Sequence, residues 1–164
     1  MEQLNVNNEL VKVNREGKSD LESFQFIVIR LGEEQYGIDI RYVDNIVRMQ
    51  NITRVPKMPA YLKGVINLRG EVIPVVSIRL KMGLTESEHT RTTRIIILKT
   101  ETSGNLGIVV DEVREVVTLR EDNIEHVSRE GRDGRASFIN GVGKHGDELI
   151  SLLELNAITL DDGV

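Results

Sequence analysis

One block of this sequence returns farther along the chain with its glycines and apolar positions in the same places. Residues 61–76 align with residues 138–153 without a gap, at an offset of 77 residues that pairs Gly64 with Gly141. Chance similarity between short β-rich runs would have to match the glycines and the apolar positions together. We therefore interpret the block as one part of an internal repeat.

A second matched pair lies upstream of each block. Residues 37–47 align with residues 107–117 at an offset of 70, which pairs Gly37 with Gly107. The two offsets differ by seven residues, and the difference falls where the second copy has the polar stretch 120–136. Insertions of this kind are tolerated in surface loops. The repeat predicts two similar lobes.

The composition favours β-structure in both lobes. Hydrophobic residues make up 40% of the chain, but aromatic residues only 4%, and tryptophan is absent. The core must therefore consist mostly of Val, Ile and Leu, which suit sheet packing. Short strands bounded by glycine turns are predicted at residues 24–29, 36–38, 65–67, 72–76, 94–98, 105–111, 113–118 and 147–153. This pattern indicates a mainly β fold of small barrels rather than a parallel α/β sheet.

Two brief helices are predicted between the strands of the first half. Apolar residues in the range 40–47 fall on one helical face, and Asp39 can cap that helix. Pro59 and Gly64 frame the other helix. Pro74 lies inside a predicted strand, where it cannot donate a ladder hydrogen bond, so this strand should be an edge or contain a bulge.

The two terminal segments and the net charge indicate where the protein is located and which partners it can bind. No apolar run approaches the ~18 residues of a spanning helix, and residues 1–23 lack the pattern of a signal peptide, so we expect a cytoplasmic protein. We expect residues 1–23 to form a mobile tail and residues 159–164 a short carboxy-terminal tail. Because the net charge is −5 and Lys and Arg are scattered, we expect neither nucleic acid nor membrane insertion.

The side chains show no sign of catalysis. His89, His126 and His145 stand in polar contexts without the spacing of a metal or triad site, and the chain has no cysteine. Residues 141–144 (GVGK) lack the spacing of a phosphate loop and are expected to form a hairpin turn. We predict no metal and no cofactor. Arg69, on a tight turn, is either a solvated tip or a guanidinium that reaches across a lobe junction.

Four segments of the chain contain recognisable motifs. Residues 64–75 (GVINLRGEVIPV) match a GVxNLRGxVIPV signature and residues 36–40 a YGIDI segment, and both resemble the CheW-like family of chemotaxis coupling proteins. Residues 107–113 and 138–142 resemble the corresponding segments of the second half. The likeness covers about residues 24–158.

The resemblance implies two SH3-like five-stranded β-barrel lobes, at about residues 24–90 and 91–158, with or without exchange of strands between them. It also implies a non-enzymatic adaptor. Such a protein couples methyl-accepting chemoreceptors to the regulatory domain of the histidine kinase CheA, and helps to control autophosphorylation of the kinase. An apolar groove at the lobe junction could take an amphipathic receptor helix. Mixed rings with kinase domains are a further implication.

The resemblance also suggests contact residues. Those carried over for the receptor are Ile40, Val43, Asn45, Gly64, Arg69 and Gly107. Those suggested for the kinase are Ile52, Thr53, Arg54 and Val55, and the central motif is Asn67, Leu68, Arg69 and Gly70. Ile40, Val43 and Gly64 could equally be core and turn residues. Family members often carry an acidic residue where this chain has Asn45, so an ion pair made there elsewhere is in doubt here.

Other functions fit the sequence less well. A small β-barrel could be an interaction module of another signalling system. It could also bind single-stranded nucleic acid, but that needs a basic groove with exposed aromatic side chains, and this acidic chain has only three Phe and three Tyr. An enzyme is disfavoured because no nucleophile and base stand at a meaningful spacing.

Overall fold

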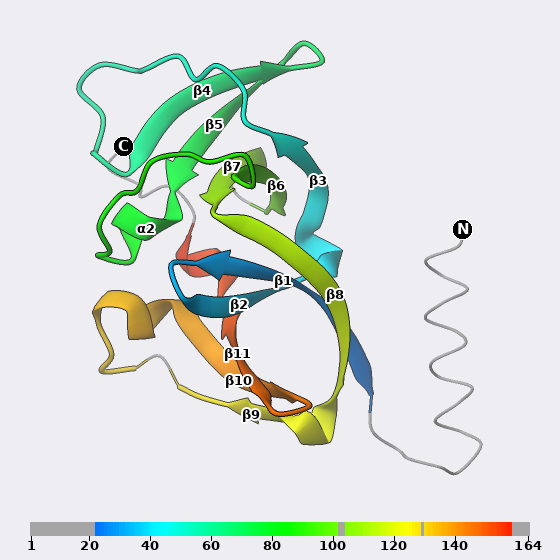
Figure 1. The fold of residues 1–164 in the computed structure, drawn as a ribbon. Helices are drawn as coiled ribbons and strands as arrows, with labels where there is room; N and C mark the ends of the chain where they lie inside the picture. The colour runs from blue at the N-terminus through cyan, green and yellow to red at the C-terminus, as the bar shows by residue number, and fades with distance from the viewer. Residues whose placement is uncertain (1–21, 102–103, 129, 159–164) are drawn as a thin grey trace.

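The computed structural model describes residues 22–101, 104–128 and 130–158, which form two curled β-sheets (Figure 1). The six-stranded sheet has the order β8 (Glu112–Arg120), β1 (Ser23–Leu31), β2 (Glu34–Asp39), β11 (Glu148–Leu153), β10 (Ile139–His145) and β9 (Ile124–His126). The five-stranded sheet has the order β3 (Val43–Arg48), β6 (Arg94–Thr100), β7 (Gly104–Val110), β5 (Glu71–Ser77) and β4 (Leu62–Leu68). Short helical turns are η1 (Ile40–Tyr42), α2 (Ile78–Lys81), η2 (Glu121–Asn123), η3 (Gly134–Phe138) and η4 (Leu155–Ala157).

The predicted mainly β class is confirmed. Within the described residues each sheet is an open series of strands, with β8 and β9 at the edges of one and β3 and β4 at the edges of the other. Closed five-stranded SH3-like barrels therefore stay a prediction. The predicted tails, residues 1–23 and 159–164, lie almost wholly outside the described residues.

Each sheet takes strands from both halves of the repeat. After β2 the chain passes through η1 into β3 of the other sheet, and after β7 it returns to the first sheet through the single residue Asp111. Neither connection forms a hairpin turn, and the next strand pairs in the opposite sheet. The lobe limits 24–90 and 91–158 consequently follow the repeat and not the sheets.

The repeat is preserved in the register of the strands, including its irregularities. In the β4–β5 hairpin a bulge falls between Leu62 and Gly64, and in the β10–β11 hairpin it falls between Ile139 and Gly141. Both pairs are related by the offset of 77. Bulges bend a strand and fix its register, so their repetition shows that both copies fold alike.

A side-chain hydrogen bond is duplicated as well. The Asn105 amide donates to the carboxylate of Glu71 at 3.2 Å, and the Gln35 amide donates to that of Glu148 at 2.7 Å. The donors differ by 70 in number and the acceptors by 77, as the two offsets require. These bonds join each hairpin end to its neighbouring strand.

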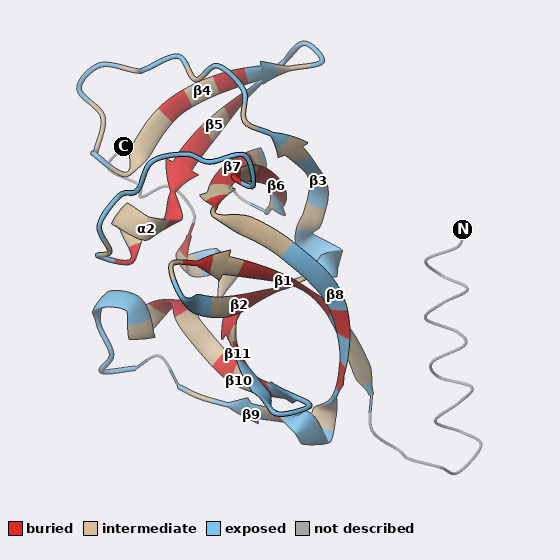
Figure 2. Cartoon of the chain, viewed as in Figure 1, coloured by how far each residue is buried: buried red, intermediate tan, exposed pale blue. Residues whose placement is uncertain are grey.

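Apolar side chains fill three layers. One cluster lies inside the six-stranded sheet around Val28 and Leu119, and another lies inside the five-stranded sheet around Ile66 and Ile95. The largest cluster packs the two sheets against each other; its members include Ile29, Tyr36, Ile38, Val76, Ile78, Leu98, Leu106 and Ile108. Figure 2 shows these buried residues along the inner parts of the strands. Because the shared cluster draws on both sheets, the lobes form one packed body.

Several local predictions were wrong. The helix expected at residues 40–47 is limited to η1, where Asp39 accepts from the Arg41 backbone N–H at 3.0 Å; β3 follows. Half-buried and exposed residues alternate along β3, because its backbone pairs with β6. No helix lies between Pro59 and Gly64, since β4 begins at Leu62.

Two further differences concern turns and edges. Residues 141–144 lie within β10 and not in a hairpin turn, because the turn follows His145 instead. β5 is not the predicted edge strand, because it lies between β7 and β4. Pro74 pairs with Val65 of β4, whereas the parallel pairing of β5 with β7 begins only at Val75. Pro74 thus stands on a locally unpaired side of its strand, as the missing N–H requires. The sequence analysis missed β9 and α2.

Candidate partner-binding surface

Three of the residues predicted to contact the receptor lie in one row across the five-stranded sheet. Cross-strand pairing joins Asn45 to Ile97, Ile97 to Gly107, Gly107 to Val75, and Val75 to Gly64. The row crosses all five strands. Residues far apart in sequence are thus brought to one level of the sheet.

The two glycines of that row allow close packing. A Cβ on Gly107 would lie 2.9 Å from the Ile95 side chain, and one on Gly64 would lie 2.1 Å from the carbonyl oxygen of Thr53. Gly64 also has a φ of +144°, a region that is essentially restricted to glycine. Both residues are buried. Their position indicates a packing role in the sheet.

The segment predicted to contact the kinase lies against this same place. Thr53 exchanges two backbone hydrogen bonds with Val65, each of 2.8 Å, so residues 52–55 run beside β4. Thr53 and Arg54 are exposed, whereas Ile52 and Val55 are half-buried. Gly64 thus supports the backbone that presents Arg54.

The other predicted receptor residues differ in exposure. Ile40, in η1, is 36% exposed, and Val43 is half-buried against the shared core. The Oδ1 atom of Asn45 accepts from the backbone N–H of Ile46 at 2.9 Å, at the bulge in β3. The Asn45 side chain therefore stabilises the local backbone of β3.

Arg69 is the exposed tip of the β4–β5 hairpin. Its φ is +54°, and the following residue, Gly70, donates its N–H to Asn67 Oδ1 at 3.1 Å. No acidic side chain of the described residues pairs with Arg69. Of the two alternatives for Arg69, the structure shows the solvated tip and not a bridge across the lobe junction.

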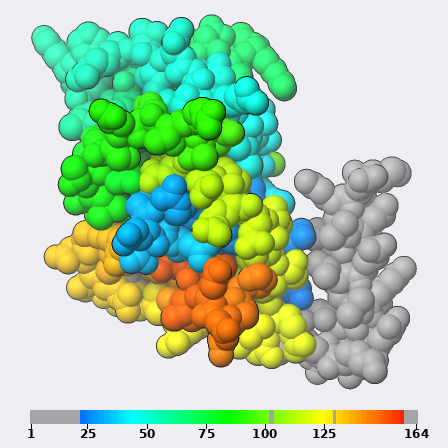
Figure 3. Space-filling model, in the orientation of Figure 1, coloured from blue at the N-terminus to red at the C-terminus, as the bar shows by residue number. Residues whose placement is uncertain are grey.

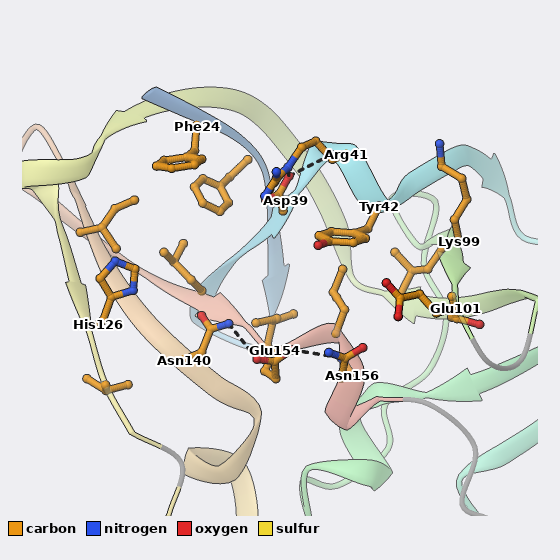
Figure 4. A pocket seen from close by; sticks show the side chains of 18 of the residues that line it. Phe24, Asp39, Arg41, Tyr42, Lys99, Glu101, His126, Asn140, Glu154 and Asn156 are labelled. Atoms are coloured by element: carbon orange, nitrogen blue, oxygen red, sulfur yellow. Dashed lines mark hydrogen bonds and ion pairs between the residues drawn. The ribbon is translucent and has the colours of Figure 1, made fainter. Parts of the chain in front are cut away.

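A groove of about 560 Å³ opens where the two sheets meet (Figure 4). Phe24, Ile124 and Leu152 give it an apolar wall from the six-stranded sheet, while Tyr42 and Lys99 face it from the other side. Tyr42 is 42% exposed. None of the predicted receptor residues lines this groove. The sequence analysis missed this groove because its walls come from six separate stretches of the chain. Only the aromatic residues beside strand ends gave any signal.

Several polar groups of the groove are paired with one another. Arg41 binds the carboxylate of Asp39 at 2.7 Å, and Glu154 accepts from the Asn140 amide at 3.2 Å. His126, 68% exposed, lies 2.9 Å from Glu121, so the expected solvated histidine does have an acidic neighbour. Within the described residues no cluster of three metal-ligating side chains occurs. The groove therefore offers shape and apolar surface rather than reactive groups.

Asp111 stabilises a part of the sheet junction that does not line the groove. Its Oδ2 accepts from the Gly32 N–H at 2.7 Å and from the Arg79 guanidinium at 2.5 Å, and Arg30 lies 4.0 Å away. Burial alone would raise the pKa of Asp111, but the hydrogen bonds from Arg79 and Gly32 outweigh it and lower the pKa below its ordinary value. The carboxylate ties the β1–β2 turn to α2.

Comparison with known proteins identifies the class. The CheW-like domain model matches residues 25–162. The chain is 33% identical over 141 residues to the chemotaxis protein CheW of Helicobacter pylori, covering 86% of this chain and 84% of that one. It is 34% identical over 134 residues to CheW of Bacillus subtilis, covering 82% and 85%.

A solved structure agrees. The scaffolding protein TtCheW from Thermoanaerobacter tengcongensis superposes with a TM-score of 0.76 at 31% identity, covering 86% of this chain and 90% of that one. The chain belongs to the CheW-like family. It is thus a chemotaxis scaffolding protein and not an enzyme, as the sequence predicted. No helix in the described part of the chain has the length and apolarity needed to cross a membrane.

Proposed function

We propose that this protein bridges the cytoplasmic tips of methyl-accepting chemoreceptors to the regulatory domain of the kinase CheA, and that it helps to control autophosphorylation of the kinase. The observation that carries the proposal is the family match over residues 25–162. The fold supports it, because two sheets joined by one shared core can hold two partners at a fixed separation. Recruitment to membrane receptor arrays and mixed rings with kinase domains belong to the same proposal.

Reconstitution tests this function directly. The purified chain is mixed with a receptor signalling fragment and CheA, and both co-sedimentation and phosphotransfer are measured with and without it. We expect the chain to be needed for the kinase to sediment with the receptor and for receptor control of phosphotransfer. If the kinase sediments and responds equally well without the chain, the proposed function is wrong.

We propose that Arg69 contacts the receptor. The other residues proposed for this contact are Ile40, Val43, Asn45, Gly64 and Gly107. Replacing Arg69 by Ala should weaken receptor binding by roughly ten- to hundredfold, because a charge-assisted contact is typically worth ~1.5–3 kcal/mol. Arg69→Lys should restore only part of the affinity, since an ammonium lacks the planar fork. Folding should be unchanged because the side chain is exposed. Titration of each variant against the receptor fragment, with melting curves, measures this.

The junction groove offers a different location for the receptor helix, and the same titration distinguishes the two. Tyr42→Ala removes an exposed aromatic wall of the groove without touching the hairpin. If Tyr42→Ala weakens receptor binding and Arg69→Ala leaves it within about 0.5 kcal/mol of the parent, the groove is the site and the assignment of Arg69 is wrong.

A further inference from the structure

The chain enters its first strand at the edge of the junction groove. The carbonyl oxygen of Glu22 accepts from the backbone N–H of Glu121 at 2.9 Å. In Figures 1 and 3 this start of β1, in blue, lies beside the yellow residues that follow β8. Glu121 and Phe24 both line the groove. Residues 1–21 are therefore tethered at the groove itself.

One part of the preceding segment has the pattern of a strand that buries one face. Residues 10–15, between two glutamates, read Leu-Val-Lys-Val-Asn-Arg, so that Val11 and Val13 alternate with polar residues. Few other large apolar residues occur in residues 1–21, and these are too few to build a core. The two valines can be buried only against a surface that is already folded. We call residues 10–15 the docking segment.

The junction groove has the size and the apolar surface to receive this segment. Its volume of about 560 Å³ is in the range of pockets that enclose small ligands. Phe24 and Ile124 are only half-buried where they pack on the cluster inside the six-stranded sheet. Tyr42 is exposed across the groove from them (Figure 4). Two walls therefore offer apolar contact.

The charges of the groove and of the docking segment are opposite. Four carboxylates line the groove against two cations, Arg41 and Lys99, a net charge of −2 with histidine uncharged. The docking segment carries +2, from Lys12 and Arg15. Glu101, exposed at the rim, has no basic partner among the residues that the structure describes. Exposed ion pairs contribute little affinity, so these charges orient the segment while the apolar contacts hold it.

The tether makes even a weak contact effective. Six residues, 16–21, separate the docking segment from Glu22, and an extended chain of that length spans about 20 Å. The segment can therefore reach the groove with slack. A short linker gives an effective concentration in the mM range, so a contact with an intermolecular Kd of about 1 mM fills the groove in roughly half of the molecules or more.

We propose that the docking segment folds back on its own chain and occupies the junction groove, with its valines against the apolar wall and its two cations at the acidic rim. The mobile tail expected from the sequence is then limited to the residues on either side of the segment. The matched family domain begins only at residue 25, so the docking segment lies outside the part that the family shares. Any partner that enters the groove must displace this segment, which makes the contact an intramolecular inhibitor of that surface. The inference does not depend on the proposed function.

A spin label in the full chain tests the contact. The chain has no cysteine, so Asn14→Cys gives a single attachment site next to Val13. Broadening of backbone amide signals by the label is measured by NMR, with the chemically reduced label as reference. We expect strong broadening at Ile124 and Glu154, which line the groove, and none at Val72, which does not.

Two pairs of substitutions in the labelled chain separate docking from mere proximity. A tethered label broadens nearby signals even without docking, and Val11→Ser with Val13→Ser sets that baseline by removing the apolar pair. We expect this pair to reduce the broadening at Ile124 by about threefold or more, because the buried apolar area is lost. Asn5→Ser with Asn7→Ser changes two polar residues outside the docking segment and should leave the broadening as in the parent. Melting curves confirm that the fold is intact in each variant.

A change on the groove side completes the test. Glu101→Lys should reduce the broadening at Ile124, and high salt should diminish that reduction, because the rim then repels the cations of the segment. If the serine pair broadens Ile124 as strongly as the parent does, the segment does not dock and the inference is wrong. Broadening that passes from a labelled copy to an unlabelled one would place the segment on a second molecule and also overturn it. Reconstitution with receptor and kinase decides the proposed function separately from either result.

Discussion

Replacing Gly64 by Ala is expected to destabilise the protein by about 3–4 kcal/mol. A Cβ there would lie 2.1 Å from the carbonyl oxygen and 2.7 Å from the carbonyl carbon of Thr53, and these are backbone atoms that cannot rotate away. The φ of +144° adds strain for any residue with a Cβ. The two hydrogen bonds between Thr53 and Val65 should then break, which is measurable by amide exchange at these two residues together with urea unfolding.

Two other glycines provide matched controls. Gly70 has a φ of +84° with open space around it, so Gly70→Ala should cost only about 1 kcal/mol. At Gly141, the equivalent of Gly64 in the repeat, a Cβ would lie 3.3 Å from the Glu125 carbonyl oxygen, so Gly141→Ala should cost much less than Gly64→Ala. A Gly64→Ala protein as stable as the parent that fails to bind the receptor fragment would instead make Gly64 a contact residue.

Replacing Asp111 by Asn should cost about 2–4 kcal/mol at neutral pH, because it leaves the Arg79 guanidinium without its carboxylate partner at the sheet junction. The side chains of Arg79 and Asp111 are 17% and 19% exposed, so water replaces little of the lost interaction. Urea unfolding at several pH values measures the effect. Asp122→Asn is the control, since Arg120 and Asp122 form a pair that is about half exposed and should change stability by less than about 0.5 kcal/mol.

The pH dependence of this effect has a defined sign. The pKa of Asp111 is lowered in the folded protein, so the carboxylate stabilises the fold fully above the ordinary Asp pKa of about 3.9. That contribution is lost as the pH falls from there through the lowered folded pKa. The stability difference between the parent and Asp111→Asn should therefore be constant near neutral pH and shrink below about pH 4. A difference that stays constant into the acid range would mean that the Asp111 charge does not hold the junction.

Local pattern was enough to predict the repeat and most strands. Glycines and apolar residues at fixed offsets can be recognised from residue identities alone. The aligned residues Gly64 and Gly141 lie at the bulges that the two hairpins share. The hairpin around Arg69 and Gly70 was also predicted, because turn chemistry is local. The motif in residues 64–75 led to the correct family.

The range 40–47 shows why local pattern fails elsewhere. Spacings of three and four residues satisfy a helical face, but Val43, Asn45 and Val47 also alternate as a strand does. Pairing with β6 decided between the two, and β6 lies about fifty residues away in sequence. Helical propensity in a short segment is too weak to resist such pairing.

The sequence by itself determined that this chain is a duplicated, mainly β member of the CheW-like family, because repeats and motifs can be recognised from the residue types alone. The tertiary structure alone decided how the halves combine. The chain crosses between the sheets at η1 and Asp111, because long-range strand pairing and burial of apolar faces in the shared cluster place β3 and β8 opposite the strands that precede them. The junction groove and the Asp111–Arg79 pair follow from that crossing, which brings together residues that give no signal of proximity in the sequence.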